Sequence, residues 1–407
     1  MTARAVAIVS TLACTVLCGP VVVAAENRVP VVATDVRIGG DDKQTRFVVD
    51  LNRKIDLAAF TLADPYRVVL DLPQTNFNLP AKAGEQIRGL VKAFRYGLIM
   101  QGGSRIVLDT KGPVRLEKAF VLDAAEGQPA RLVLDLVATD RASFMRNIVL
   151  ENRPAYSTSI RPSEAPPKPD NDPRPLIVLD PGHGGIDNGT KGAGGELEKD
   201  VVLAFAQTLR EKLESTGKFR VAMTRSDDTF IPLAERVRFA RSRSAGLFIS
   251  VHADALPRRE GQAEGATVYT LSENASDAEA ARLAEAENKA DVIAGVDLTT
   301  EPDDVANILV DLAQRETKTF SMQFARTVVA ELKTAARLHK HPLKSAGFKV
   351  LLAPDVPSVL VELGYMSTKD DLKQLTSASW RARTAQALAQ AVDSFFTPRV
   401  ATGGGRN

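Results

Sequence analysis

The sequence predicts two domains of different class: an all-β sandwich, followed by an α/β domain whose mixed sheet is flanked by helices. Residues 31–139 consist of short β-branched runs separated by turn-forming residues, with no long helical stripe. Residues 176–398 alternate apolar runs with amphipathic helical patterns. The 407 residues are too many for one core, and a content of 44% hydrophobic and 25% charged residues is typical of globular domains.

Residues 1–25 have the pattern of a secretory signal peptide. Arg4 gives a charged start, residues 5–17 are apolar, and residues 23–25 offer a cleavage site of small side chains. A retained membrane anchor is the alternative, but the apolar run is short and is interrupted at residues 19–20 by glycine and proline. We therefore expect an exported chain without stable membrane insertion.

The cysteines and the charge balance exclude several kinds of site. Cys14 and Cys18 both lie in the expected signal peptide, so the exported chain would have no disulfide and no cysteine-ligated zinc. The 52 basic residues are nearly balanced by 50 acidic ones, and the net charge is only +2. Because the sequence also has no long basic block, we expect no nucleic-acid partner.

A repeated motif organises the all-β half. It consists of arginine, three apolar residues and aspartate, and it occurs at residues 46–50, 67–71, 105–109 and 131–135. Along a strand, the arginine, the middle apolar residue and the aspartate share one face, and the other two apolar residues point to the core. Ala-Phe-x-Leu precedes the second and fourth copies, which indicates a duplicated sandwich. For the arginines and aspartates, we expect cross-strand ion pairs on a solvated face in preference to direct ligand contact.

Between the two domains, residues 140–175 are predicted to be a linker that is rich in proline from residue 161 onward. Such a segment buries too little apolar surface to fold, so it should form an extended tether. At the other end of the chain, residues 399–407 are predicted to be a disordered tail.

The elements of the α/β domain follow from its apolar runs and helical stripes. Strands are expected at residues 176–180, 219–224, 246–251, 266–271, 348–352 and 358–361, and helices at 199–216, 233–244 and 377–396. One segment, residues 272–317, does not fit the strand-helix alternation and is interpreted as an insertion. Its helical patterns lie at residues 277–291 and 303–312.

Four polar residues mark one end of the predicted sheet. His183, His252 and Glu362 follow the ends of strands, and Glu198 precedes a helix. Functional groups in open α/β sheets gather beyond the carboxyl ends of the strands. Two imidazoles and a carboxylate are the ligands that a catalytic zinc uses when one position stays open, with Glu362 as the base beside it. Taken singly, a histidine among glycines is a turn residue and Glu198 a solvated helix start, so the pattern alone leaves both interpretations open.

Other polar residues near these positions have supporting or structural roles in this interpretation. Asp180 and Asp254 are expected to accept hydrogen bonds from the ligand imidazoles. His339 and His341 lie in a basic stretch, residues 337–344, which we expect to be a solvated loop at the end of a helix.

These motifs resemble a known family, the zinc-dependent N-acetylmuramoyl-L-alanine amidases (amidase_3) that cut bacterial peptidoglycan. The segments that carry the resemblance are residues 177–185, the segment around Glu198, and residues 248–254 and 357–364. The resemblance covers roughly residues 175–398 and departs from the usual pattern at residues 241–246 and 366–368, none of which is a metal-ligand position. The β-rich half resembles the AMIN-type targeting domain of the division-associated periplasmic members.

The resemblance implies hydrolysis of the amide bond between N-acetylmuramic acid and the L-alanine of the stem peptide, in cell-wall remodelling and daughter-cell separation in the periplasm. It implies Zn²⁺ bound by His183, Glu198 and His252. It also implies that Glu362 is the catalytic acid and base, beside a water that zinc acidifies. The alternatives are a zinc peptidoglycan endopeptidase or carboxypeptidase, and an inactive wall-binding protein.

The inserted segment has a counterpart in that family, in which an inhibitory helix can cover the zinc cleft and place a glutamate on the open metal position. Glu287 is the first candidate for that glutamate and Glu279 the second. The alternative is an ordinary solvated helical excursion. Release of an inhibitory helix requires a partner, for which the resemblance suggests a LytM-type activator at the division septum.

Overall fold

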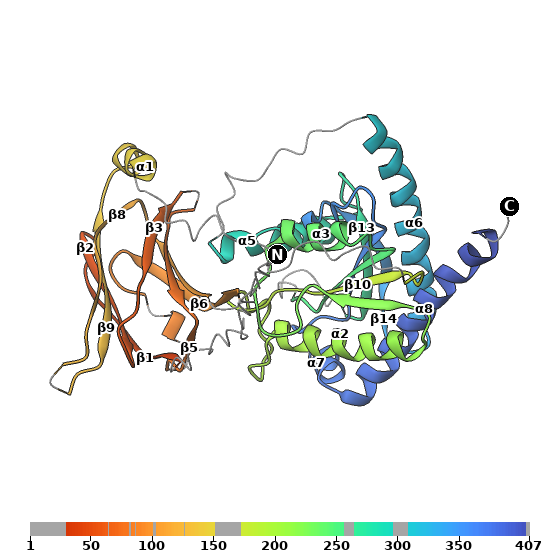
Figure 1. Cartoon of the computed structure of the whole chain (residues 1–407), viewed down its shortest axis with the longest axis horizontal. Coiled ribbons are helices and arrows are strands. Elements are labelled where there is room, and N and C mark those ends of the chain that lie inside the picture. Colours follow the sequence, from red (N-terminus) through yellow and green to blue (C-terminus); the bar gives the residue numbers. More distant parts are fainter. Residues whose placement is uncertain are drawn as a thin grey trace, which may run out of the picture. The chain divides into compact units, whose positions relative to one another are not determined.

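The structure is a computed structural model of the chain, drawn in Figure 1. It describes residues 30–63, 65–80, 83–85, 87–100, 103–125, 127–150, 172–255, 264–295 and 308–403. The expected signal peptide and the proline-rich part of the linker lie outside the described residues.

The first half of the described chain is a β-sandwich. One sheet has the strand order β5 (Thr75–Phe77), β1 (Val31–Gly40), β2 (Gln44–Leu51), β9 (Ala130–Ala138), β8 (Val114–Leu122). The other has the order β3 (Ala58–Leu62), β4 (Arg67–Pro73), β7 (Gly103–Thr110), β6 (Val91–Met100), with a short 3₁₀ turn, η1 (Ala83–Glu85), before β6. Phe47 and Leu134 from the first sheet and Leu70 and Ile106 from the second are buried in one core. The predicted all-β class is confirmed.

The register of the two sheets supports the predicted duplication. In the hairpin of β3 and β4, Phe60 lies opposite Val69, the middle residue of its motif. In the hairpin of β8 and β9, Phe120 lies opposite Val133, the middle residue of the equivalent motif. The same aromatic residue therefore faces the same motif position in both sheets.

A helix that the sequence pattern does not predict follows the sandwich. Helix α1 (Arg141–Leu150) begins after Asp140, whose side chain accepts a hydrogen bond from the backbone N–H of Ser143. Phe144 is buried against Tyr66 of the sandwich, with ring centroids 5.0 Å apart. A single aromatic anchor and a capping aspartate stabilise this turn of chain without a repeating apolar stripe, which explains why periodicity alone does not reveal it.

The second half contains a mixed sheet, as predicted. Its strand order is β11 (Arg220–Met223), β10 (Leu176–Pro181), β12 (Leu247–His252), β15 (Ser358–Glu362), β13 (Ala266–Leu271), β14 (Leu338–Ala346). The first four strands are parallel, and β13 runs antiparallel to β15. The predicted fold class of the second half is therefore confirmed.

Helices cover both faces of this sheet, as Figure 1 shows. On one face lie α2 (Glu198–Ser215), α6 (Ile308–Leu332) and α8 (Ala378–Gly403). On the other lie α3 (Leu233–Ser242), α4 (Ala278–Glu287) and α5 (Ala290–Ile293). A further helix, α7 (Lys369–Leu375), precedes α8. Because neighbouring residues of a strand point to opposite faces, Ile177 packs with the first group and Val178 with the second.

Two predictions about local structure are wrong. The strand expected at residues 348–352 is instead a 3₁₀ turn, η4 (Lys349–Leu351), because its apolar side chains are buried by a turn rather than by sheet pairing. The solvated loop expected at residues 337–344 is part of strand β14, in which His339 and Lys344 are buried. Its many basic residues concealed the alternation that identifies a strand.

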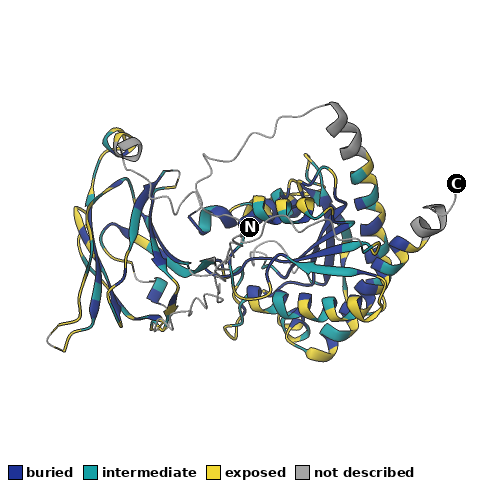
Figure 2. Ribbon diagram, viewed as in Figure 1, coloured by how far each residue is buried: buried dark blue, intermediate teal, exposed yellow. Residues whose placement is uncertain are grey.

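Burial follows these layers. Figure 2 shows that the inner strands of the mixed sheet are buried, while the helices around them keep exposed outer faces. The outer strand β11 is half-buried, and β14 has both buried and exposed residues. In the part of the chain that the structure describes, no helix is both long enough and apolar enough to span a bilayer.

Candidate metal centre and active site

The parallel strands bring the predicted site residues to one edge of the sheet. His183 follows the end of β10, and His252 is the last residue of the adjacent strand β12. In the next strand, β15, Glu362 lies opposite His252 in the register. The three side chains therefore begin at the carboxyl ends of three neighbouring strands, where the topology favours a site.

The turn after β10 has a backbone shape that only its sequence permits. His183 has a φ of 59°, in the left-handed region that non-glycine residues rarely adopt. A Cβ atom on Gly182 would lie 2.3 Å from Cε1 of His252, so only glycine allows this approach. Arg236 stabilises the turn by donating to the backbone carbonyl of His183 at 2.7 Å, and Arg225 donates to that of Gly182 at 2.7 Å. Strained backbone of this kind is concentrated at functional sites.

Glu198 opens helix α2 and is completely buried. Its Oε1 accepts a hydrogen bond from the N–H of Ala253 at 2.8 Å, and its Oε2 accepts one from the N–H of Thr190 at 2.9 Å. Backbone amides from two separate segments thus fix the carboxylate, and the helix N-terminus favours its negative charge. Glu198 is therefore held as an ionised group pointing at the strand ends.

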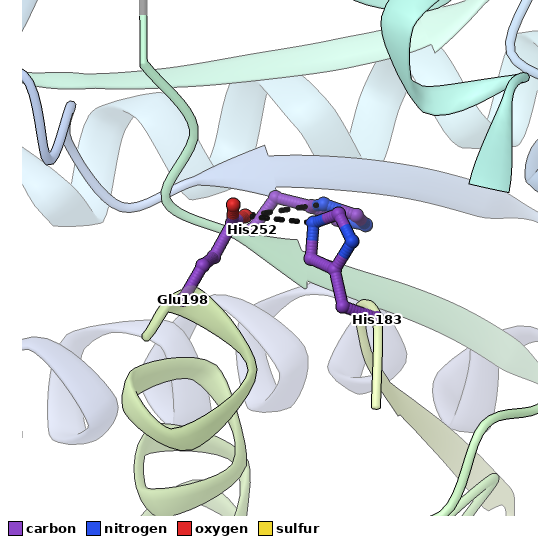
Figure 3. A group of neighbouring side chains, drawn as sticks. All are labelled: His183, Glu198 and His252. Atoms are coloured by element: carbon purple, nitrogen blue, oxygen red, sulfur yellow. Dashed lines mark ion pairs between the residues drawn. The ribbon is translucent and has the colours of Figure 1, made fainter. Parts of the chain in front are cut away.

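The three predicted ligands converge, as Figure 3 shows. One ligand atom from each of His183, Glu198 and His252 lies within 4.8 Å of the others. Oε1 of Glu198 is 3.1 Å from Nε2 of His183 and 3.5 Å from Nδ1 of His252. This spacing is what three ligands around one small cation require.

The buried polar atoms of this cluster lack the partners that buried groups normally have. Among the described residues, Nε2 of His183, Nδ1 of His252 and Oε1 of Glu362 are buried without a hydrogen bond. Oε1 of Glu198 lies 3.1 Å from Nε2 of His183, but no hydrogen bond joins them. Buried nitrogen and oxygen atoms that lie close together without hydrogen bonds are the arrangement expected around a metal ion.

Asp187 orients the first imidazole. Its Oδ2 lies 2.8 Å from Nδ1 of His183, which leaves Nε2 as the free nitrogen of that ring. The prediction that Asp180 and Asp254 accept from the imidazoles is wrong. Asp180 instead accepts from Ser250 and Arg236, and Asp254 accepts from the hydroxyl of Thr190. The spacing of four residues between His183 and Asp187 was the signal that could have identified this partner.

The carboxylates of the cluster favour positive charge at the two imidazoles. Burial lowers the pKa of His183, but the carboxylates of Glu198 and Asp187 outweigh burial and hold this pKa well above its ordinary value. Burial likewise lowers the pKa of His252, but the carboxylate of Glu287 helps to raise it overall. The neighbouring carboxylates stabilise positive charge at the two imidazoles. A divalent metal ion can supply that charge in place of protons.

Glu362 has different electrostatics. It is fully buried, and burial together with the nearby Asp254 raises its pKa well above the ordinary value. Its Oε2 accepts a hydrogen bond from the backbone N–H of Asp254 at 3.0 Å, which fixes the side chain. Glu198 and Glu362 are thus two buried carboxyl groups that differ in proton affinity, the pattern of a ligand beside a proton-transferring residue.

Comparison with known proteins identifies the family of the chain. The profile of the N-acetylmuramoyl-L-alanine amidase family matches residues 177–394, and that of the AMIN domain matches residues 35–136. The chain is 34% identical to N-acetylmuramoyl-L-alanine amidase AmiC of Escherichia coli O6:H1, over 89% of this chain and 88% of the relative. The chain belongs to the N-acetylmuramoyl-L-alanine amidase family. Its activity is hydrolysis of the amide bond between N-acetylmuramic acid and L-alanine in peptidoglycan.

Two further relatives of the amidase are similar over different parts of it. AmiC of Neisseria meningitidis serogroup B is 34% identical, over 90% of this chain and 90% of the relative. AmiA of Escherichia coli K12 is 41% identical, over 54% of this chain and 76% of the relative.

Helix α4 of the amidase places its last residue at the imidazoles. Oε2 of Glu287 is 3.0 Å from Nδ1 of His252 and 3.8 Å from Nε2 of His183. Glu287 is 7% exposed, and burial raises its pKa to about 7. Its carboxylate therefore lies beside the same two ring nitrogens as the carboxylate of Glu198.

Glu279, near the start of the same helix, lies elsewhere. Its Oε1 is 2.8 Å from Nζ of Lys344 and 3.4 Å from the hydroxyl of Tyr365. Of the two glutamates predicted to reach the metal position, the structure brings Glu287 to the histidines and Glu279 to Lys344. The sequence could not show which glutamate reaches the metal position, because the two lie only eight residues apart on one helix.

The inserted helices are also held at their far end. The N–H of Leu233 donates to Asp291 at 2.9 Å, and Asn288 bonds to the backbone on either side of Phe348. Carbonyl groups at the end of α5 accept hydrogen bonds from sandwich arginines: Arg67 to Val292 (2.6 Å), Arg95 to Ile293 (3.1 Å), and Arg105 to Ala294 (3.2 Å) and Gly295 (3.0 Å). Cationic donors at these carbonyls, of which that of Val292 also accepts the N–H of Gly295, stabilise the helix end.

Proposed function

We propose that the amidase is a zinc enzyme whose metal is held by His183, Glu198 and His252. The observation that carries this proposal is the convergence of two buried, unbonded imidazole nitrogens on a carboxylate whose orientation backbone amides fix. Catalytic zinc sites have three protein ligands of these types and a fourth position that remains open. Zinc bound there supplies a Lewis acid that acidifies the attacking water and polarises the scissile carbonyl.

Glu362 is the proposed acid and base. Its unbonded Oε1 is free to accept the proton of the attacking water, while its other oxygen is held by the N–H of Asp254. Because its pKa is raised, the protonated carboxyl group can persist until it delivers that proton to the nitrogen of the departing L-alanine. Asp187 keeps His183 in the tautomer whose Nε2 carries a free lone pair.

Helix α4 is proposed to inhibit the enzyme. The carboxylate of Glu287 lies at the ring nitrogens that the metal would use, so it would complete the metal's coordination and exclude water. The enzyme is then active only when the inserted segment leaves. We assign that release to a LytM-type activator protein at the division septum, the partner that the family resemblance implies.

Export and targeting complete the proposal. The signal-like residues 1–25 and the AMIN domain are consistent with a periplasmic enzyme of cell-wall remodelling and daughter-cell separation, in which residues 31–139 direct the chain to the wall. The proposed tether lies between this domain and the catalytic domain at residues 176–398.

Digestion of purified sacculi tests the proposed function. The full chain and its Glu287→Ala variant are incubated with sacculi, and the soluble products are identified by mass spectrometry, with and without a chelator. We expect intact stem peptides that begin with L-alanine, more of them from the variant, and none after chelation. Products that arise from cleavage within the stem peptide would instead indicate an endopeptidase or carboxypeptidase, and insensitivity to the chelator would exclude the metal.

A further inference from the structure

Helix α4 contacts the catalytic domain through carboxylates at both of its ends. Glu287 lies at the imidazoles of the metal centre, and Glu279 lies at Lys344. The eight residues between them correspond to about 12 Å along an α-helix. The helix therefore presents two negative charges, about 12 Å apart, to two separate groups on the surface that it covers.

Lys344 is a buried cation whose carboxylate partners belong to the inserted segment. It is 4% exposed, and its Nζ lies 2.8 Å from Glu279 and 3.2 Å from Asp277, the N-cap residue of α4. Arg236, by contrast, pairs with Asp180 within the sheet core. Departure of α4 would remove both carboxylate partners of Lys344 and make its ammonium group available to another carboxylate.

The surroundings of Lys344 are suited to an anion. Besides Lys344, Glu279 has the hydroxyl of Tyr365 at 3.4 Å and Nε2 of His339 at 3.9 Å. Nδ1 of His339 contacts both the backbone N–H and the carbonyl oxygen of His341 at 3.1 Å, which leaves Nε2 as the ring nitrogen that faces Glu279. An ammonium group, a hydroxyl group and an imidazole nitrogen thus lie within 3.9 Å of one carboxylate oxygen.

The sheet joins this group of donors to the catalytic residues. Strand β13 lies between β15 and β14, with Thr267 opposite Glu362 on one side and Tyr269 opposite Lys344 on the other. The hydroxyl of Tyr365, three residues after Glu362, lies 3.3 Å from that of Thr267. The anion site and the catalytic carboxylate are therefore on adjoining strands beneath the same helix.

We propose that Lys344, with Tyr365 and His339, binds a carboxylate of the stem peptide, and that Glu279 occupies this subsite when α4 covers the cleft. The proposal rests on the proposed amidase function and its inhibition by α4. An extended peptide covers about 12 Å in three to four residues, so the carboxylate belongs to the early part of the stem peptide on the leaving-group side. Helix α4 then resembles the substrate, with one carboxylate at the metal centre and one at Lys344.

Ligand binding tests this subsite without relying on turnover. The background is the full chain with Glu279→Ala and Glu287→Ala, which removes both helix carboxylates, and with Glu362→Gln, which prevents cleavage. Calorimetry measures the Kd of a muramyl tripeptide as the free acid, as the amide of its second residue, and as the amide of its third residue. Lys344→Gln and Lys344→Arg are then added separately.

We expect Lys344→Gln to weaken binding of the free acid about tenfold or more, because a charge-assisted hydrogen bond to a buried partner is lost. One of the two amides should bind as weakly as the free acid binds to Lys344→Gln, and the substitution should not weaken that amide further. This arm identifies which residue supplies the carboxylate. Lys344→Arg should restore most of the affinity, which separates a charge effect from misfolding.

Equal weakening of all three ligands by Lys344→Gln, no weakening of the free acid, or no binding of any ligand to the background protein would overturn the subsite. A failure of the proposed function looks different. In that case the same protein with Glu362 restored would release no peptide from any muramyl ligand. The effect of Lys344→Gln on the Kd would still be measurable by calorimetry. With Glu362 present, the subsite predicts a raised KM and a kcat within about twofold, since Lys344 does not touch the scissile bond.

Discussion

Two parts of the catalytic domain present carboxylates to the same pair of imidazoles, and they do so in different ways. Glu198 opens helix α2 beside the carboxyl ends of the parallel strands, and both of its oxygens accept backbone N–H groups. Glu287 belongs to the inserted helix α4, and its contacts run to the ring nitrogens of His252 and His183. A carboxylate fixed by backbone amides can serve as a permanent ligand, whereas one fixed only by the site itself can leave with its helix.

This difference predicts opposite signs for substitutions in the two parts. Changes at the sheet edge should lower activity, because that edge supplies the chemistry. Changes in the inserted segment should raise activity, because we propose that this segment covers the active site. All activities below are initial rates on labelled sacculi, and folding of each variant is checked by thermal unfolding.

The largest effect is expected for His252→Ala. Without one of the two imidazoles, the remaining ligands should not retain zinc at the concentration of the purified protein, and hydrolysis should fall to the background rate. Elemental analysis should show about one zinc per chain in the parent and almost none in the variant. A variant that keeps a full equivalent of zinc would contradict the assigned ligand.

The next effect is the loss of the proton-transferring residue. Glu362→Gln should lower kcat by about 10²- to 10⁴-fold, the usual contribution of general acid–base catalysis, while zinc content stays at the parent level. The rate is measured in the Glu287→Ala background so that inhibition does not mask the loss. Unchanged turnover would remove Glu362 from the mechanism and leave it as a buried structural carboxyl group.

A smaller loss is expected from the partner of His183. Asp187→Asn removes the charge at 2.8 Å from Nδ1 but keeps the size of the side chain, and should weaken zinc affinity about 10- to 100-fold. Competition with a chromogenic chelator measures this change. Asp254→Asn is a matched control, because Asp254 contacts Thr190 rather than an imidazole, and it should change zinc affinity far less.

The sign should reverse at Glu287. Glu287→Ala removes the carboxylate beside the two imidazoles and should raise basal hydrolysis about tenfold or more, which corresponds to about 1.4 kcal/mol less stabilisation of the covered state. Glu285→Ala is the control on the same helix, since Glu285 pairs with Lys289 at the exposed surface. Equal activation by both substitutions would indicate general loosening of α4 instead of release of the metal centre.

The smallest effect distinguishes the two sheets of the sandwich. Arg105 is buried, pairs with Asp71 and donates to carbonyls at the end of α5, whereas Arg46 makes the equivalent pair with Asp135 on an exposed face. Arg105→Ala should raise basal activity by about two- to tenfold, because hydrogen bonds from a charged group to the covering segment are lost. Arg46→Ala removes an ion pair of the same kind and should leave activity unchanged. Activation by Arg46→Ala as well would show that the effect comes from the stability of the sandwich.

The sandwich arginines also show which features could be predicted from the sequence. The cross-strand ion pairs predicted from the repeated motif are confirmed for Arg46 with Asp135 and Arg105 with Asp71. Arg67 of the second copy instead donates to the backbone carbonyls of Pro65 and Val292. The solvated face holds for Arg46, whose side chain is 58% exposed, but not for Arg105, whose side chain is 7% exposed. Identical motifs cannot reveal which copy will be covered, because the cover comes from residues almost 200 positions away.

Periodicity and motif order determined the two fold classes and singled out His183, Glu198, His252 and Glu362, since a strand end or helix start fixes where such a side chain begins. Tertiary structure decided the rest. It made Asp187 rather than Asp180 the partner of His183, because the direction of a side chain depends on the turn that carries it. It also separated Glu287 from Glu279 and placed the basic residues around Lys344 in a strand, in which Lys344 itself is buried. Each of these outcomes depends on which surface a helix or strand packs against, and that information lies in contacts between distant segments, not in the local pattern of residues.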